Sequence, residues 1–359
     1  MRQLWKKKNN MKSEFNYNFL NKKNILVTGG TGSFGSYFVK TVLNYSNPKR
    51  LVIFSRDEFK QSELQKELAN HPNNKCLRFF IGDVRNLDRL KVSCRDIEIL
   101  VHAAALKQID TAEYNPFECI DTNIKGAENV VRASISSSIK KVITISTDKA
   151  VNPINLYGAS KLAADKIFIS SNQSARTEDA KFSVVRYGNV IASRGSVIPY
   201  FLNISKDKKQ LIHVTDKNMT RFWLSIHDAV QFVLSCIEHM IGGEIFIPKM
   251  PSIKTIDIAQ ALAPSNKIKF TGKRPGEKVH EVLIPEDYSG FTYENQNRYI
   301  IFPEFIDSKK ITALKYKKYY KNLKKVNELF RYDSLNNSNW ISKNKIKSFI
   351  NDSIKKNII

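Results

Sequence analysis

Four ionisable side chains stand close together in the stretch ISTDKAVNPINLYGASK, which covers residues 145–161. Two of them, Tyr157 and Lys161, are four residues apart, so a helix would place both on one face. A tyrosine has an ordinary pKa of about 10, but a neighbouring ammonium favours the phenolate and lowers that pKa. Such a tyrosine can take a proton from an alcohol while a nicotinamide accepts the hydride. Tyr157 and Lys161 are therefore candidate catalytic residues.

The other two ionisable residues, Asp148 and Lys149, are consecutive and follow an apolar run. An amine that has lost its proton is a competent base, and a carboxylic acid is a competent proton donor. Each group would then work in its less common protonation state. The alternative is a surface salt bridge or an ion pair in a loop at the end of a strand, which contributes little to stability.

A glycine motif lies upstream, in NILVTGGTGSFGSYFVKTVL, which reads as strand, turn and helix. Gly29, Gly32 and Gly35 stand three apart, which allows a tight turn, close approach of a pyrophosphate, and packing of the helix on the strand. The first turn of the helix offers free N–H groups to an anion. This context favours a dinucleotide site over an incidental glycine turn, and it strengthens the catalytic interpretation of Tyr157 and Lys161.

The residues that follow the second predicted strand, in VIFSRDEFK, bear on which dinucleotide is bound. Ser55, Arg56 and Lys60 can receive the 2'-phosphate of NADP, whereas Asp57 could hold the ribose hydroxyl of NAD. The balance favours NADP. Asp83, just past the third predicted strand, is placed to contact the adenine, with a helix cap or turn aspartate as the alternative.

The elements that must position these residues alternate along the chain. Short apolar runs rich in β-branched residues predict strands, and helix-like stretches such as 33–44 and 127–136 lie between most of them. The predicted strands cover residues 25–27, 51–54, 77–81, 97–101, 142–145 and 182–185. This alternation predicts βαβ units, hence an α/β fold with a doubly wound parallel sheet covered on both faces.

The pattern changes after about residue 200 to mixed elements, with a helix near 233–240 and a strand in GEIFIP. We therefore expect four regions: a basic N-terminal tail over 1–21, a dinucleotide-binding Rossmann domain over 22–205, a substrate-binding lobe over 206–345, and a basic C-terminal tail over 346–359. Some segments of the lobe should return to the Rossmann sheet.

Length and composition limit the classes of protein that the chain can represent. Its 359 residues, 42% of them hydrophobic, are enough for one large domain and a smaller one, and no apolar run approaches the roughly 18 residues of a membrane span. The four cysteines lack CxxC spacing, which argues against a zinc site and a disulfide framework and fits the cytoplasm. The net charge of +24 comes from dispersed lysines, so we expect no nucleic-acid partner, although a polyanion-binding face stays an alternative.

Several motifs together resemble the extended short-chain dehydrogenase/reductase superfamily. They are TGGTGSFG, HAAALKQ, ISTDKA, NPINLYGASK and RYGNVIASRGSVIP, followed by MTRFW, GGEIFIPKMPS, KRPGEKVHE and NNSNW. Within that superfamily the chain is similar to the configuration-inverting UDP-N-acetylglucosamine 4,6-dehydratases that begin pseudaminic acid synthesis, from about residue 22 to about residue 345. The tyrosine of NPINLYGASK is typical of the flagellar or surface pseudaminic pathway, because capsule and O-antigen relatives often carry methionine there.

The resemblance implies a mechanism and roles for the residues. Tyr157 would deprotonate the C4 hydroxyl as hydride passes to NADP, and Thr147 would bond the C4 oxygen. Lys149 would then remove the acidified C5 proton while Asp148 protonates the departing C6 hydroxyl, and Lys161 would reach the nicotinamide ribose. Relatives that retain the C5 configuration carry an Asp-Glu pair at positions 148 and 149, so the lysine here implies inversion.

The resemblance also implies the binding residues and the assembly. Expected cofactor contacts are Gly29, Thr31, Gly32, Ser33, Phe34, Gly35, Ser55, Arg56, Lys60, Asp83, Val84, Ala103, Lys107, Thr122, Tyr157 and Lys161. Expected contacts with the UDP-sugar are Lys107, Asn189, Arg194, Arg221, Arg274 and Glu277. The family implies a homo-oligomer without a metal or a membrane partner. Two other readings remain open: a retaining dehydratase or 4-epimerase on another nucleotide sugar, and a non-catalytic NADP- or polyanion-binding protein.

Overall fold

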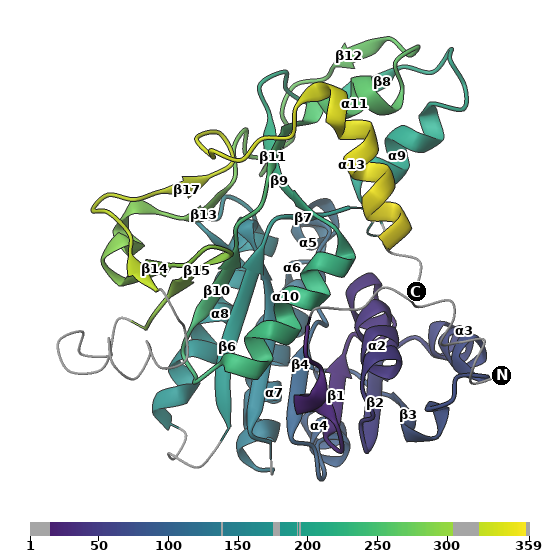
Figure 1. Ribbon diagram of the computed structural model, residues 1–359, viewed down its shortest axis with the longest axis vertical. Helices are drawn as coiled ribbons and strands as arrows, with labels where there is room; N and C mark the ends of the chain where they lie inside the picture. Colours follow the sequence, from purple (N-terminus) through teal and green to yellow (C-terminus); the bar gives the residue numbers. More distant parts are fainter. Residues whose placement is uncertain are drawn as a thin grey trace.

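The computed structural model describes residues 15–137, 139–174, 180–191, 193, 195–303 and 323–356. Its central element is one large sheet. The described strands of this sheet are β1 (Asn24–Thr28), β2 (Arg50–Ser55), β3 (Leu77–Ile81), β4 (Ile99–His102), β5 (Lys141–Thr147), β6 (Lys181–Tyr187), β10 (Ile245–Pro248), β14 (Thr292–Glu294), β15 (Arg298–Ile301) and β16 (Lys324–Lys325). They lie in the order β16-β14-β15-β10-β6-β5-β4-β1-β2-β3 (Figure 1).

The pairing within this sheet confirms the predicted fold class. From β3 to β10 neighbouring strands are parallel, whereas β15, β14 and β16 add an antiparallel edge. The strand order reverses beside β1, between β1 and β4, as in a doubly wound fold. All six apolar runs of the first half are strands, although β4 begins two residues later than the sequence suggested, at Ile99.

Helices cover both faces of the sheet (Figure 1). On one face α2 (Ser33–Tyr45) packs against α10 (Ile226–His239), with α3 (Glu58–Leu68) joined to α2 through the Lys40–Glu67 ion pair. On the other face α4 (Leu87–Ser93), α7 (Gly126–Ile135) and α8 (Leu156–Ser174) form a contiguous layer. The predicted helices 33–44 and 127–136 correspond to α2 and α7.

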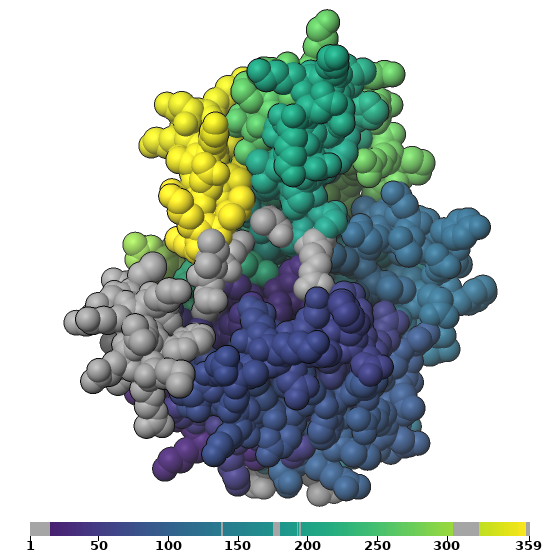
Figure 2. Space-filling model, turned by 90° about the vertical axis from the view of Figure 1, so that its right-hand side faces the viewer, coloured from purple at the N-terminus to yellow at the C-terminus, as the bar shows by residue number. Residues whose placement is uncertain are grey.

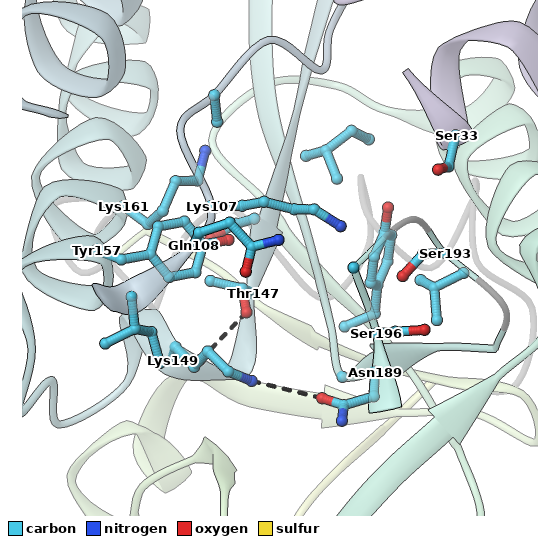
Figure 3. A pocket seen from close by; sticks show the side chains of 18 of the residues that line it. Ser33, Lys107, Gln108, Thr147, Lys149, Tyr157, Lys161, Asn189, Ser193 and Ser196 are labelled. Atoms are coloured by element: carbon cyan, nitrogen blue, oxygen red, sulfur yellow. Dashed lines mark hydrogen bonds between the residues drawn. The ribbon is translucent and has the colours of Figure 1, made fainter. Parts of the chain in front are cut away.

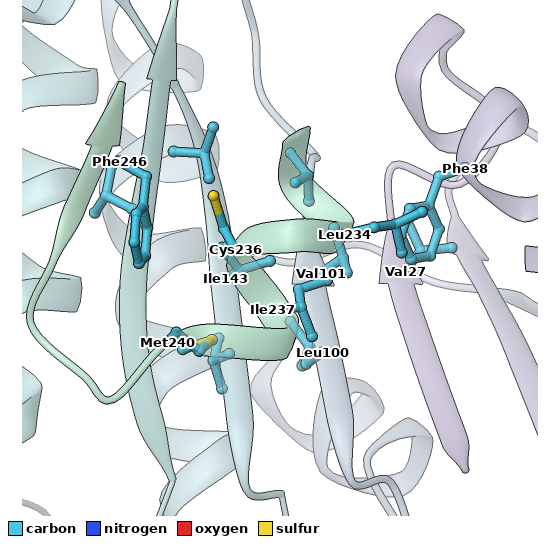
Figure 4. Close-up of a cluster of buried hydrophobic side chains, with 14 of the residues drawn as sticks. Val27, Phe38, Leu100, Val101, Ile143, Leu234, Cys236, Ile237, Met240 and Phe246 are labelled. Carbon is cyan, nitrogen blue, oxygen red and sulfur yellow. The ribbon is translucent and has the colours of Figure 1, made fainter. Parts of the chain in front are cut away.

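The main core lies on both faces of the sheet, under α2 and α10 on one side and α4, α7 and α8 on the other. This cluster includes Leu234 and Ile237 of α10, Leu100 and Val101 of β4, and Phe38 of α2 (Figure 4). All five side chains are fully buried. Burying a side chain of this size stabilises the fold by about 1.5–3 kcal/mol, so this contact holds the carboxyl ends of the strands in fixed positions.

A second, smaller lobe stands over the carboxyl ends of these strands. It contains β7 (Asn189–Val190), α9 (Val197–Ile204), β8 (Ile212–Val214), β9 (Thr220–Leu224), β11 (Ser252–Lys254), α11 (Thr255–Leu262), β12 (Ile268–Phe270), β13 (Val282–Ile284), β17 (Tyr332–Asp333) and α13 (Lys343–Lys356). Its own core gathers Trp223, Ile198 and Phe201 with apolar residues of α11 and α13. Figure 2 shows this lobe above the half that contains the large sheet, with a hollow between them.

The described parts of both predicted basic tails pack into the folded protein. At the C-terminal end, Ile346 and Ile350 are fully buried as one face of α13, which packs against α11. Their spacing of four residues gives the otherwise lysine-rich helix an apolar stripe. At the N-terminal end, Tyr17 stacks on Tyr45 and Leu20 is fully buried in the main core. Residues 1–14 and 357–359, and most of the lysine-rich segment before residue 323, lie outside the described residues.

Two features that the sequence does not predict, a membrane-spanning helix and a metal site, can be looked for in the described part of the chain. In that part, none of the helices is long and apolar enough to cross a membrane. Among the same residues no group of histidine, cysteine or carboxylate side chains has the arrangement of a metal site, and the four cysteines are unpaired thiols.

Candidate active site

A pocket of about 560 Å³ lies between the sheet and the smaller lobe. The glycine turn before α2, the ends of β4 and β5, and α8 form one wall. The other wall is formed by residues 187–190, 193, 195–197, 221, 274–277 and 281. Ligands of doubly wound sheets bind at the carboxyl ends of the strands, beside the reversal of strand order. The pocket has this position, and Figure 3 shows the polar side chains that point into it.

The glycine turn has the geometry that a pyrophosphate requires. Gly29 has φ +65°, and a Cβ there would come within 2.9 Å of the backbone of Ala103. The N–H of Gly32 donates to the carbonyl of Gly29 at 2.9 Å, and a Cβ on Gly35 would overlap that same carbonyl oxygen. Gly32 caps α2 without a side-chain hydrogen bond, so the first amides of the helix face the pocket. This cradle fits a dinucleotide, and Ser33 and Phe34 line it.

The residues expected at the adenosine end lie beyond the residues that line this pocket. Asp57 is the N-cap of α3: its carboxylate accepts from the N–H of Lys60 at 2.9 Å, and the Lys60 ammonium lies 2.5 Å from it. Ser55 is buried and bonded to Gln61. Arg56, whose side chain is 52% exposed, lies 3.8 Å from Asp83 and is the residue of this group most open to a ligand.

Asp83 is held by Arg85, whose guanidinium donates to its carboxylate at 2.7 and 2.9 Å. Burial acts to raise the pKa of Asp83, but the hydrogen bonds from Arg85 outweigh burial and the pKa is lowered. Asp83 also accepts from the N–H of Arg85, which is the contact expected of an aspartate in a turn. The carboxylate stays ionised at the end of β3.

The other expected cofactor residues lie close to the pocket. Ala103 and Lys107 line it, whereas Thr31 and Val84 are buried and are not among the lining residues. The hydroxyl of Thr122 is buried and has no hydrogen-bond partner among the described residues. A buried hydroxyl of this kind costs free energy unless it finds a partner, and Thr122 is not among the residues that line the pocket.

Tyr157 and Lys161 lie on one face of α8, as their spacing predicted, and both line the pocket (Figure 3). The expected pKa of the tyrosine is wrong: burial raises the pKa of Tyr157 to about 12, and Lys149 and the Thr147 hydroxyl oppose burial without overcoming it. The cation that acts on the phenol is thus Lys149. Burial also lowers the pKa of Lys161, and Asp165 opposes that shift.

Asp148 and Lys149 form an ion pair, with Lys149 Nζ 3.0 Å from Asp148 Oδ1, in which Lys149 lines the pocket and Asp148 is not among the lining residues. Asp148 is fully buried, accepts from the hydroxyl of Thr147 at 2.9 Å, and has no partner for Oδ2 among the described residues. Lys149 is 21% exposed and lies 3.4 Å from Asn189 Oδ1 (Figure 3). The pair is therefore not a surface salt bridge, although it does follow directly on the end of β5.

The protonation of Lys149 is set by its carboxylate neighbours. Burial acts to lower the pKa of Lys149, but Asp148 and then Glu281 outweigh burial, and the pKa is raised. The ammonium form is the ground state of the described protein. Any role for Lys149 as a base thus requires that its proton first move to a neighbour.

The expected sugar-nucleotide residues gather on the opposite wall, where Asn189, Arg221, Arg274 and Glu277 line the pocket. Arg221 is buried, and its guanidinium donates to the backbone carbonyls of residues 220, 278 and 279 at 2.7, 2.8 and 3.0 Å. These hydrogen bonds hold residues 278 and 279 against β9. They leave fewer N–H groups of Arg221 for a diphosphate than the sequence suggested. Arg194 lies outside the described residues.

Other lining residues were missed by the sequence interpretation. Glu281 lies in the quoted motif KRPGEKVHE, and its carboxylate is 3.8 Å from Lys149 Nζ. Gln108, Tyr187 and Ser193 also line the pocket. A glutamate 132 positions beyond Lys149 in the chain carries no local signal, and only the three-dimensional fold brings it to the catalytic strand.

The chain is similar to known proteins over most of its length. A family model described as "Polysaccharide biosynthesis protein" matches residues 25–303. UDP-N-acetylglucosamine 4,6-dehydratase (inverting) from Campylobacter jejuni subsp. jejuni serotype O:2 is 49% identical over 336 residues, 92% of this chain and 98% of the relative. A UDP-glucose 4-epimerase from Rickettsia bellii is 44% identical over 272 residues, 74% of this chain and 78% of the relative.

Solved structures give the same fold. The X-ray structure of Pen from Bacillus thuringiensis matches with a TM-score of 0.84 and 36% identity, covering 94% of this chain and 99% of that one. DesIV, a dTDP-glucose 4,6-dehydratase from Streptomyces venezuelae with NAD and TYD bound, matches with a TM-score of 0.63 and 20% identity, over 71% of this chain and 86% of that one. The second likeness supports the fold alone.

Proposed function

The chain belongs to the polysaccharide biosynthesis protein family of the extended short-chain dehydrogenase/reductase superfamily, and we propose that it is a UDP-N-acetylglucosamine 4,6-dehydratase that inverts C5. One observation supports this function best: a lysine, rather than a second acid, is paired with Asp148 beside Tyr157. An epimerase needs the glycine cradle and the tyrosine, but it needs no acid and base for an elimination. The likeness to the Rickettsia epimerase keeps 4-epimerisation as the second candidate.

The ion pair can generate both working forms in one step. Transfer of the Lys149 proton across the 3.0 Å hydrogen bond to Asp148 leaves a neutral amine and a neutral carboxylic acid. The amine is then the base for C5, and the acid is the proton donor for the C6 hydroxyl. Because the pair holds its own proton in the pocket wall, neither group has to exchange with bulk water before the elimination.

The proposed reaction consumes no net hydride and no net proton. The oxidised nicotinamide, when bound, supplies the hydride acceptor for C4 and the donor for C6, and its positive charge favours the Tyr157 phenolate. Tyr157 takes the proton of the C4 hydroxyl, and Lys149 takes the C5 proton that the new ketone has acidified. The C5–H electrons form the C5–C6 double bond, and the C6–O bond breaks as Asp148 protonates the leaving hydroxyl to give water. A proton that returns to the opposite face of C5 balances the one taken from O4.

The product distinguishes the two candidate functions. Incubation with UDP-N-acetylglucosamine, followed by NMR, should reveal a methyl group at C6 and loss of the C4 proton. An epimerase would instead keep the C6 hydroxymethyl group and return a C4 proton with altered couplings. Appearance of the C4 epimer without a methyl signal would contradict the dehydratase assignment.

We further propose that the cofactor is NADP rather than NAD. Asp57 is engaged as the N-cap of α3, which leaves Arg56 as the exposed group at the end of β2. A guanidinium pairs well with a 2'-phosphate, because it donates two parallel hydrogen bonds to phosphate oxygens.

Arg56→Ala should therefore weaken NADP binding by about 10-fold, since a hydrogen bond to a charged group contributes roughly 1.5–3 kcal/mol and this site is partly exposed. NAD binding should change little. Titration of each dinucleotide by calorimetry measures both constants, and Arg95→Ala, at a position away from the pocket, is the matched control. An equal loss for NADP and NAD would contradict recognition of the phosphate by Arg56.

We also propose a pathway, a compartment and an assembly for this protein, from the same resemblance. The product would enter pseudaminic acid synthesis in the cytoplasm, for glycosylation of flagellin or another surface glycan. The protein would act as a homo-oligomer, associated through helices that flank the sheet. The UDP-sugar relatives and the tyrosine of NPINLYGASK support this assignment.

A further inference from the structure

Glu281 is a buried carboxylate in the pocket wall that the roles above do not use. It is 3% exposed and lies among three cations: its Oε1 is 3.8 Å from Lys149 Nζ and 3.9 Å from Arg221 Nε, and its Oε2 is 3.6 Å from Lys278 Nζ. Oε2 makes no hydrogen bond to the described residues. A carboxylate buried in this way is costly unless its charge is used by its neighbours.

The backbone holds Glu281 firmly in this position. Its N–H donates to the hydroxyl of Ser334 at 3.0 Å, and its carbonyl accepts from the N–H of Ser334 at 2.8 Å. Strand β13 follows directly and pairs with β17, and the Arg221 guanidinium fastens residues 278 and 279 just before it. The carboxylate is therefore presented to Lys149 by fixed elements on both sides.

Lys149 thus has a carboxylate neighbour on two sides, Asp148 at 3.0 Å and Glu281 at 3.8 Å. The two neighbours differ in what the elimination asks of them. Asp148 must carry a proton in order to give it to the C6 hydroxyl, so it is neutral when the amine of Lys149 takes the C5 proton. At that moment Glu281 is the remaining carboxylate within 4 Å of Lys149 Nζ among the described side chains. Burial raises the pKa of Glu281, and the nearby Lys149, Arg221 and Lys278 oppose that shift and favour its anion.

We propose that Glu281 is a positioning residue for the C5 step, which holds the Lys149 amine toward the sugar and stabilises the ammonium that forms there. The proposal rests on the proposed function and goes beyond it by separating two roles for the acids around Lys149. Asp148 moves the proton, and Glu281 supplies a fixed charge. A preorganised charge at the point where charge develops in the transition state is an effective source of catalysis.

A purely structural role is the competing explanation, because Glu281 also faces Arg221 and Lys278. Loss of a structural counterion would lower the thermal midpoint and slow hydride removal from C4 and proton removal from C5 together. Loss of the proposed role would slow the C5 step alone. The distinction requires a measurement that is specific for each step.

Glu281→Gln keeps the shape of the side chain and removes its charge. We expect kcat to fall about 100-fold, as for removal of one preorganised stabilising group, with KM little changed. Because the C5 step becomes rate-limiting, the isotope effect on kcat with substrate deuterated at C5 should rise above the wild-type value. The absorbance of the reduced cofactor should still appear at the wild-type rate after mixing with substrate.

Two further variants complete the test. Glu244→Gln removes another fully buried glutamate, one bonded to Ser183 and outside the pocket lining, and it should keep the wild-type isotope effect. Glu281→Asp keeps the charge on a shorter side chain, and it should recover part of the lost kcat. If Glu281→Gln does not fold, Glu281→Asp is measured in its place, and its isotope effect should also rise above the wild-type value.

The outcomes separate this inference from the proposed function. If the wild-type protein forms no 4-keto-6-deoxy product, the proposed function fails. If it does, and Glu281→Gln has either an unchanged isotope effect or an equal loss in the C4 and C5 steps, Glu281 is structural and the inference fails. A raised isotope effect with an unaffected C4 step supports the inference.

Discussion

Lys149→Ala is expected to abolish the release of water while NADP binding survives. The variant lacks the base for C5, and it also lacks the proton that Asp148 needs for the leaving hydroxyl. Loss of a positioned proton-transfer group costs about 100- to 10,000-fold in rate, and here two transfers depend on the one amine. Product formation followed by NMR, together with a calorimetric titration of NADP, measures both parts of the prediction.

Lys149→Arg is the matched control for the charge of this residue. A guanidinium stays protonated, so it can pair with Asp148 and Glu281 but cannot act as a base. We expect the arginine variant to keep the stability of the wild-type protein and to be as inactive as Lys149→Ala. Turnover at the wild-type rate in either variant would contradict the role of Lys149 in proton transfer.

Tyr157→Phe has the second large expected effect, a loss of about 100- to 10,000-fold in oxidation at C4. The ring and its packing are kept, and the hydroxyl that takes the C4 proton is lost. Tyr299→Phe is the control, because this tyrosine is equally buried, at 9% exposed, and does not line the pocket. The rate at which reduced cofactor appears after mixing with substrate measures the step.

The pH dependence of the same step gives a second readout for Tyr157. Burial raises the pKa of this phenol to about 12 in the described protein, so the phenol is protonated at neutral pH and the phenolate fraction grows as pH rises. Oxidation at C4 should therefore accelerate with pH in the wild-type protein. Tyr157→Phe should lose this rise, and an unchanged profile in the variant would assign the base to another group.

The sequence predicted the sheet well because its strands are buried on both faces. Residues 25–27 and 51–54 are continuous apolar runs that a helix stripe would not explain, and they became β1 and β2. The antiparallel edge of β14, β15 and β16 was not predicted strand by strand, because short edge strands carry a weak alternation. Helix α13 was missed because two buried isoleucines are hidden among lysines.

The same reasoning explains which site residues could be predicted. Thr147, Asp148, Lys149, Tyr157 and Lys161 lie on one strand end and the next long helix, so local spacing alone brings them together. The pKa of Tyr157 could not be predicted in this way, since it depends on burial by distant segments.

Residues on the opposite wall depend on long-range contacts. Glu281 reaches Lys149 because β13 pairs with β17 and Arg221 fastens the segment before β13, which are contacts between parts far apart in the chain. Arg221 lines the pocket as expected, but the sequence did not predict the partners of its side chain. Its type suggested a diphosphate ligand, but its guanidinium mainly binds backbone carbonyls.

The arrangement of Asp148 and Lys149 at the sugar is best tested by the fate of C5 in deuterated water. Incubation of the wild-type protein with UDP-N-acetylglucosamine in this solvent, followed by NMR of the product, reports both the isotope at C5 and its configuration. We predict deuterium at C5 in a 4-keto-6-deoxy sugar of the L-arabino configuration. A product with the D-xylo configuration, or one that keeps the original C5 proton, would contradict inversion by this pair.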